Sequence, residues 1–246
     1  MITLLADPAA LDLPELRVDG EAYQHLFRAR RVAVGEEMRV VDGKGRARWG
    51  KVARVDRTSA TVALGEPAPN REPAFQLTLL VPTCRPERAS WLIEKATEVG
   101  VSAIQFLNMA RAPRDLGMGT FDRLRRVAMA AVEQSHRSRL PEITGPYAFQ
   151  DAVRLASGSR WFLDPEATED GANGVGVDHE GTSGALLVGP EGGLDPGERR
   201  QLLESGWTPV GLGDRILRLE TAAVVGAALI LIPASGIKNP KSEISN

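Results

Sequence analysis

The stretch LLVGPEGGLDPGE, residues 186–198, places apolar residues before a glycine-rich loop. Glycine loses more freedom on folding than any other residue, so three glycines within 189–193 call for a tight turn, a close approach or a ligand. Asp195, Pro196 and Glu198 then form the pattern of a helix start with a capping box. Open α/β sheets bind ligands where a strand, a tight loop and a helix start follow one another. The loop is predicted to line a pocket, with a purely structural turn as the alternative.

Apolar segments and segments with helical periodicity alternate from residue 76 onward. Short apolar strands between helices require a mainly parallel sheet that is covered on both faces. This region is therefore predicted to be an α/β domain. Strands are expected at 76–82, 102–108, 160–164, 184–189 and 208–213, and helices at 87–100, 120–135, 148–157, 196–206 and 220–232.

A proline-rich segment, EPAPNREPAFQ at 66–76, indicates a domain boundary, which divides the chain into residues 1–70 and 71–246. Before it, residues 21–32 have helical spacing, and Asp19 is placed to cap that helix. Several short strand-like runs follow, with a turn at Asp42 and Gly43. This pattern predicts a small β-barrel, a shape that often holds RNA.

The 246 residues are 43% hydrophobic and 25% charged, which is typical of a globular protein that is not disordered. The formal net charge is only −2, but from residue 111 to residue 139 seven arginines face three acids, a local excess of four positive charges. Such a stretch favours contact with a polyanion, although a solvated helix face is equally usual.

The sequence argues against several classes of protein: secreted proteins, membrane proteins, metalloproteins and common nucleotide-binding proteins. The first residues do not resemble a secretory signal, and the apolar run 222–232 is too short to cross a bilayer, so we expect a cytoplasmic protein without a membrane segment. Cys84 is the single cysteine, and His25, His136 and His179 lack metal-ligand spacing, so no metal site is expected. The glycine-rich segments do not complete a P-loop or a dinucleotide-binding pattern.

A second stretch, GLGDRILRLETAAVVGAALILI at 211–232, combines a loop with a helix that is apolar almost all round. Thr221 is placed to cap this helix. A helix without a polar face must be buried on all sides, which favours burial against a second copy of the chain. An ordinary central helix is the alternative.

Together these segments resemble the signatures of the RsmE family, in the SPOUT superfamily of RNA methyltransferases. The resemblance rests on VGPEGGLDPGE (188–198) followed by LGDRILRLETA (212–222). Further matches are EKATEVGV (94–101), AAVEQSHRSRLPEI (130–143) and, more loosely, HLFRARRVAVGEEMRVVDGKG (25–45). They extend over both expected domains.

The resemblance implies an N-terminal PUA-like barrel, a C-terminal α/β domain with a deep trefoil knot, and a homodimer. It also implies transfer of a methyl group from S-adenosyl-L-methionine to N3 of one uridine in 16S ribosomal RNA, presented as RNA or as the assembled small ribosomal subunit. Two alternatives stay open: a methyltransferase of the same class acting on another RNA such as transfer RNA, and a catalytically silent RNA-binding assembly factor.

The resemblance also assigns candidate site residues. Arg218 is expected to stabilise the uridine anion. Glu191 is expected either to orient the base or accept a proton, or only to satisfy nearby amides; no certain general base emerges. The cofactor contacts are expected to be Val188, Gly189, Pro190, Glu191, Gly192, Gly193, Leu212, Gly213, Ile216, Leu217, Arg218, Glu220 and Thr221. Contacts to RNA phosphates are expected from Arg28, Arg30 and Arg31 on the barrel and from Arg111, Arg114, Arg137 and Arg139 on the catalytic domain.

Overall fold

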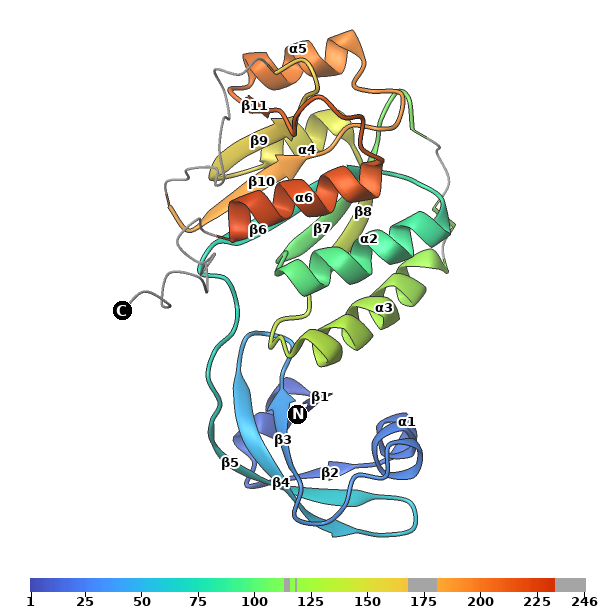
Figure 1. Cartoon of the computed structure of the whole chain (residues 1–246), viewed down its shortest axis with the longest axis vertical. Coiled ribbons are helices and arrows are strands. Elements are labelled where there is room, and N and C mark those ends of the chain that lie inside the picture. Colours follow the sequence, from blue (N-terminus) through green and yellow to red (C-terminus); the bar gives the residue numbers. More distant parts are fainter. Residues whose placement is uncertain (113–115, 118, 168–180, 233–246) are drawn as a thin grey trace, which may run out of the picture. The chain divides into compact units, whose positions relative to one another are not determined.

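The structure of the protein is a computed structural model, which describes residues 1–112, 116, 117, 119–167 and 181–232 (Figure 1). The chain forms two compact units. The first comprises residues 1–72 together with residues 126–141, and the second comprises residues 73–125 and the chain from residue 142 onward. The inclusion of residues 126–141 in the first unit was not anticipated by the sequence-based boundary at 70 and 71, and the division between the units falls within one helix.

The first unit contains a curled five-stranded sheet in the order β1-β3-β4-β5-β2. Strands β1 and β3 are parallel, and the other neighbours are antiparallel. The core on the sheet includes the fully buried side chains of Met38, Val40 and Val62. The strands are β1 (Ile2–Leu5), β2 (Glu15–Val18), β3 (Glu37–Val41), β4 (Ala47–Val55) and β5 (Ala60–Pro67).

The helix expected at 21–32 is shorter than predicted. It consists of α1 (Gly20–Tyr23), which continues into a single π-helical segment, η2 (Gln24–Ala29). Asp19 stands at the N-cap but makes no side-chain capping bond, so that expectation was wrong; its carboxylate pairs instead with Arg17, at 3.4 Å. The hydroxyl of buried Tyr23 donates to the carbonyl of Asp56, at 2.6 Å, and anchors the helix.

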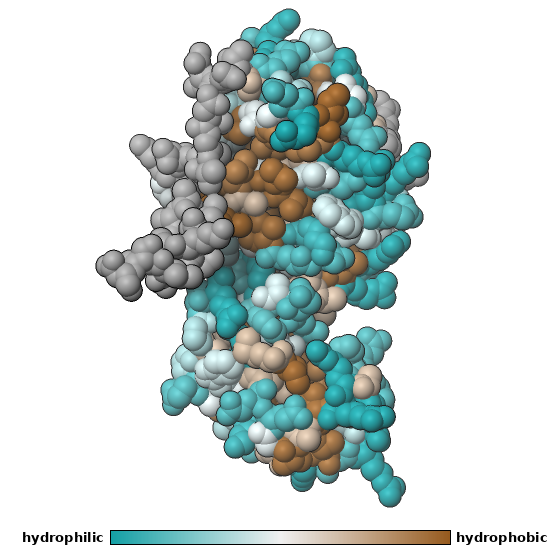
Figure 2. All heavy atoms as spheres, in the orientation of Figure 1, coloured by the Kyte–Doolittle hydropathy of each residue, from teal (hydrophilic) through white to brown (hydrophobic). Residues whose placement is uncertain are grey.

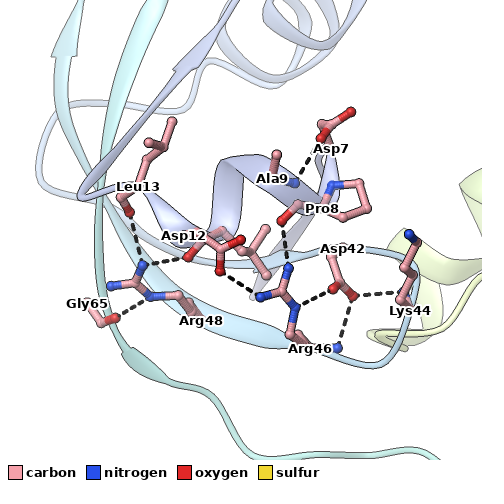
Figure 3. A network of polar contacts seen from close by, with 11 residues as sticks. Asp7, Pro8, Ala9, Asp12, Leu13, Asp42, Lys44, Arg46, Arg48 and Gly65 are labelled. Atoms are coloured by element: carbon pink, nitrogen blue, oxygen red, sulfur yellow. Dashed lines mark hydrogen bonds and ion pairs between the residues drawn. The ribbon is translucent and has the colours of Figure 1, made fainter.

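Two arginines, Arg46 just before β4 and Arg48 within it, fasten a short 3-10 helix, η1 (Pro8–Asp12), to the sheet (Figure 3). The Arg46 guanidinium donates to the carboxylates of Asp42 and Asp12, in each case at 2.7 Å. Arg48 donates to the carbonyl of Leu11 at 2.7 Å. Because both guanidinium groups are occupied by internal hydrogen bonds, this network serves the fold of the first unit.

The second unit is built on six parallel strands in the order β11-β9-β10-β6-β7-β8. The prediction of a mainly parallel sheet is confirmed. The strand at 142–148 was missed, because Gly145 and Pro146 interrupt its apolar pattern with turn-forming residues. The strands are β6 (Gln76–Pro82), β7 (Ala103–Asn108), β8 (Glu142–Ala148), β9 (Ser159–Leu163), β10 (Ser183–Leu187) and β11 (Thr208–Val210).

Helices cover both faces of this sheet, as predicted. On one face, α4 (Phe149–Leu155) and α5 (Pro196–Glu204) pack in a cluster with Leu80 and Leu187 of the central strands. On the other, α6 (Leu219–Leu231) approaches so closely that a Cβ atom on Gly226 would lie 2.8 Å from Leu186. Helix α2 (Pro86–Val99) packs beside α6 (Figure 1). The remaining helix, α3 (Thr120–Ser135), has the predicted bounds.

No helix in the described part of the chain has the length and apolar character needed to cross a membrane. The trefoil knot stays a prediction.

Candidate active site

The parallel sheet brings the expected site loops to one edge. The glycine loop follows β10, and the loop 211–218 follows β11. Because all six strands point the same way, the segments after β6 and β7 lie at this edge too. The chain runs outward from β6 through β7 and β8, and then returns to build β9, β10 and β11 on the other side. Ligands bind where strand order reverses in this way.

The glycine loop is a tight turn between a buried strand end and α5. The amide of Val188, which is buried, donates to the carbonyl of Leu80 at 2.9 Å. The amide of Gly193 donates to the carbonyl of Pro190 at 2.8 Å. Gly193 has a φ of +73°, a conformation in which a side chain is strained. The turn thus accounts for one of the three glycines.

The predicted capping box at the start of α5 is confirmed. The Asp195 carboxylate accepts the amide of Gly197 at 2.8 Å, and the Glu198 carboxylate accepts the amide of Asp195 at 2.9 Å. The second Glu198 oxygen accepts the amide of Ala110, which follows β7, also at 2.9 Å. Glu198 therefore joins the end of the glycine loop to the neighbouring strand end.

Two arginines hold the exposed part of the glycine loop. Arg111, after β7, donates from Nη1 to the carbonyl of Gly192 at 2.7 Å. A Cβ atom on Gly192 would lie 3.3 Å from Cδ of Arg111, so the missing side chain permits this approach. Arg88 on α2 forms an ion pair with the carboxylate of Glu191. Arg111, which was expected to bind an RNA phosphate, thus contacts the glycine loop itself. Glu191 pairs with Arg88 instead of accepting the nearby amides.

The second loop, residues 211–218, is the more open of the two. Gly213 has a φ of +83° and no heavy atom within 4 Å of a Cβ position, and Ile216 is fully exposed. Leu212 and Leu217 are half-buried. Arg218 is exposed, with extended backbone at the N-cap of α6.

Helix α6 begins at Leu219, three residues earlier than a cap at Thr221 would allow. Thr221 therefore lies inside the first turn, and the expectation that it caps the helix was wrong. Pro190 is buried, whereas Thr221 and Gly189 are half-buried. The predicted cofactor contacts stay predictions.

Glu220 is the unusual member of the candidate set. It lies in the first turn of α6, is 9% exposed, and has a buried Oε2 atom without a hydrogen-bond partner among the described residues. Cys84, after β6, is also buried. Burial raises the pKa of the Cys84 thiol to about 11, with a further contribution from the negative charge of Glu220, while Arg88 acts in the opposite direction. Sequence reasoning named neither Cys84 nor Arg88 as site residues, because no motif signal marks them.

This edge has the features that a nucleoside cofactor requires. It offers main-chain groups of a glycine loop, apolar side chains such as Val188 and Leu212, open space at Gly213 and the unpartnered oxygen of Glu220. Within the described residues, no group of three or more histidine, cysteine or acidic side chains is arranged to hold a metal ion.

The arginines expected to contact RNA fall into different environments. Arg28, Arg30 and Arg31 are exposed around the end of η2. Arg28 donates to the carbonyl of Arg57 at 2.7 Å, and its guanidinium carbon lies 5.7 Å from the centre of the Tyr23 ring. These three positions keep their guanidinium groups at the surface of the first unit.

Arg137 requires a correction. It belongs to the first unit, is 3% exposed, and forms an ion pair with Glu72 at 2.6 Å, so it is not an available phosphate contact. Arg139 also belongs to the first unit and is half-buried, and its amide donates to Glu72 at 3.0 Å. Arg114 lies outside the described residues.

Comparison with known proteins gives matches to both units. Residues 70–231 match the model of an RNA methyltransferase domain, and residues 18–64 match that of an RNA methyltransferase PUA domain. The latter agrees with the predicted PUA-like barrel. In structure, the chain resembles a methyltransferase of Legionella pneumophila solved with the bound cofactor SAM, with a TM-score of 0.77 and 26% identity over 93% of this chain and 95% of that one.

Curated relatives match nearly full length. The ribosomal RNA small subunit methyltransferase E of Mycobacterium bovis is 31% identical, over 87% of this chain and 84% of its own. The protein of the same name from Bacillus subtilis is 25% identical, over 89% and 90%. These matches confirm the resemblance drawn from the motifs, and the chain belongs to the family of RNA methyltransferases that includes the ribosomal RNA small subunit methyltransferases E.

Proposed function

We propose that this protein transfers a methyl group from S-adenosylmethionine to N3 of one uridine in small-subunit ribosomal RNA, and that it does so in the cytoplasm. The observation that carries the proposal is the family match over residues 70–231, a range that contains both loops at the carboxyl edge of the sheet. The names of the curated relatives and the SAM-bound Legionella structure support the reaction and the cofactor.

The residues expected to hold the cofactor lie in the two loops after β10 and β11. When bound, S-adenosylmethionine supplies an activated methyl group. The protein must chiefly align the reacting atoms and exclude water, which is catalysis by positioning. The main chain of residues 188–193 and 211–218, with the apolar side chains beside it, serves that purpose and needs no metal.

Arg218 and Glu191 take different roles in this proposal. Arg218 is exposed at the start of α6, where its guanidinium can meet the negative charge that spreads over the uridine carbonyls when N3 loses its proton. Glu191 is paired with Arg88, which favours an orienting role over proton transfer. The RNA backbone is expected to meet the exposed arginines 28, 30 and 31, with an affinity that falls as salt rises.

The exposed face of α6 supports a homodimer. Val225 and Ile232 are 38% and 44% exposed, and Trp91 on neighbouring α2 is 42% exposed. Figure 2 shows hydrophobic residues gathered over α6. An apolar helix face of this kind is expected to pack against a second copy. Sedimentation should show a dimer for the native protein and a monomer for Val225→Glu. If both proteins are dimers, this face is not the interface.

The function is tested by mapping the product. The protein is incubated with labelled S-adenosylmethionine and with either small subunits that lack the modification or bulk transfer RNA. We expect label in the small subunit as N3-methyluridine. Label in transfer RNA would support another target, whereas cofactor binding without transfer to either RNA would support a silent assembly factor.

A further inference from the structure

The unpartnered oxygen of Glu220 marks it as a residue with a task beyond folding. A buried carboxylate oxygen without a hydrogen bond is costly, and native proteins seldom keep one without a reason. Glu220 is 9% exposed, and its Oε2 atom is buried without a partner among the described residues. Its position in the first turn of α6 stabilises negative charge, because helix N-termini carry a partial positive charge.

The charged side chains near Glu220 in the described part of the chain do not form an ion pair with it. Cys84 after β6 is close enough to interact electrostatically with Glu220 and with Arg88 of α2. The Arg88 guanidinium is already paired with Glu191 of the glycine loop. Arg218, two residues earlier in the chain, is exposed. Glu220 is therefore connected to the glycine loop through Cys84 and Arg88. No cation among the described residues forms an ion pair with it.

The other acids at this edge are occupied or exposed. Glu191 pairs with an arginine, Glu198 accepts two amides, Asp195 accepts one, and Asp164 accepts an arginine and an amide. The remaining acids of these loops face water. No histidine lies in the described part of the second unit. Among the described acids of this edge, Glu220 is thus the one that is buried and has a carboxylate oxygen without a hydrogen-bond partner.

We propose that Glu220 is the general base that removes the N3 proton of the target uridine, an inference that rests on the proposed function. The proton moves from N3 to Oε2, and the electron pair of the N–H bond stays on the nitrogen. That nitrogen then bonds to the methyl carbon while the carbon–sulfur bond breaks and leaves its pair on sulfur. The proton on Glu220 is released to water afterwards. Arg218, on the same helix end, stabilises the anion formed between these two events.

Glu220→Gln tests the assignment, since the amide keeps the shape and loses the basicity. Single-turnover transfer to unmodified small subunits is measured from pH 6 to pH 10, with cofactor affinity measured by calorimetry. At saturating S-adenosylmethionine we expect a rate about 10²–10⁴-fold lower at neutral pH, the range typical of general-base catalysis, with any change in cofactor affinity too small to account for that loss. The variant's rate should rise about tenfold per pH unit, because N3 must then ionise in solvent.

Further comparisons separate proton removal from a structural role. Fluorine at C5 lowers the pKa of the uridine N3 proton. RNA carrying 5-fluorouridine should therefore raise the transfer rate of Glu220→Gln more than it raises the rate of the native protein. Glu204→Gln, at an exposed position at the end of α5, should behave as the native protein does. Because Oε2 of Glu220 is buried without a hydrogen-bond partner among the described residues, Glu220→Gln should be at least as stable as the native protein. Glu220→Asp should keep the native pH profile at a lower rate.

The outcomes distinguish this inference from the function on which it rests. If the native protein methylates uridine and Glu220→Gln does so equally fast, the base is another group while the function stands. A loss of rate that follows a loss of cofactor affinity, or that neither high pH nor 5-fluorouridine restores, also overturns the assignment. If the native protein transfers no methyl group to uridine, both proposals fail.

Discussion

Removing the buried carboxylate of Glu72 should destabilise the first unit strongly. Glu72 accepts hydrogen bonds from Arg137 at 2.6 and 3.1 Å and from the amides of Ser138 and Arg139 at 2.7 and 3.0 Å. The side chains of Glu72 and Arg137 are only 7% and 4% exposed. Glu72→Ala therefore removes a counter-charge from a buried guanidinium and an acceptor from two amides. Breaking a buried pair in this way costs about 3–5 kcal/mol.

Urea unfolding followed by circular dichroism and tryptophan fluorescence, at one protein concentration, measures this loss. The matched control is Asp19→Ala, also in the first unit, whose carboxylate pairs with Arg17 where the two side chains are 66% and 72% exposed. An exposed pair contributes about 0–1 kcal/mol, so the control should change little. If Glu72→Ala unfolds no more easily than the control, the ion pair does not support this unit.

The same carboxylate gives a pH dependence whose sign is fixed. Burial alone would raise the pKa of Glu72, but the hydrogen bond and charge of Arg137 and the amides of Ser138 and Arg139 hold it below the ordinary 4.5. A lowered pKa contributes stability that is present above the unfolded value and is lost as the pH falls through the folded value. The stability difference between the native protein and Glu72→Ala should therefore shrink below about pH 4.5. A difference that grows with acid would contradict this.

Three further predictions concern the second unit. Gly192→Val should crowd Arg111 and weaken S-adenosylmethionine binding in calorimetry by about tenfold to a hundredfold, the equivalent of about 1–3 kcal/mol of overpacking; unchanged affinity would remove this loop from the cofactor site. Arg218→Ala should leave cofactor affinity nearly intact and slow transfer by about 10²–10³-fold, and an unaltered turnover would exclude it from the mechanism. Cys84, whose thiol pKa is raised to about 11, should react with a thiol reagent at pH 8 at least about a hundredfold more slowly in the native protein than in urea, and fast labelling would show that it is not buried.

Periodicity predicted those elements whose local pattern agrees with their final environment. The strand at 76–82 and the helix at 120–135 have the predicted bounds, because each is continuously apolar or amphipathic over its whole length. The strand at 142–148 was hidden, since its middle residues are those that usually form turns. The cap at Asp195 was predicted from three residues, because a capping box is a local device.

Long-range pairing is what the sequence does not reveal. Arg137 looks like a surface arginine until the fold brings Glu72 to it, sixty-five residues away. Likewise, Gly43 forms a β-bridge with Arg139, and such contacts place residues 126–141 in the first unit. The candidate loops after β10 and β11 were predicted from the motifs, since glycine patterns are local, but the burial of Glu220 and its open oxygen emerged only from the packing of α6.

A crystal structure of the protein with bound S-adenosylmethionine tests the central claim most directly. The account places the cofactor against the main chain of residues 188–193 and 211–218, at the carboxyl ends of β10 and β11, with its methyl group open toward Arg218 and Glu220. A cofactor bound at any other edge of the sheet, or in the first unit, would contradict the account.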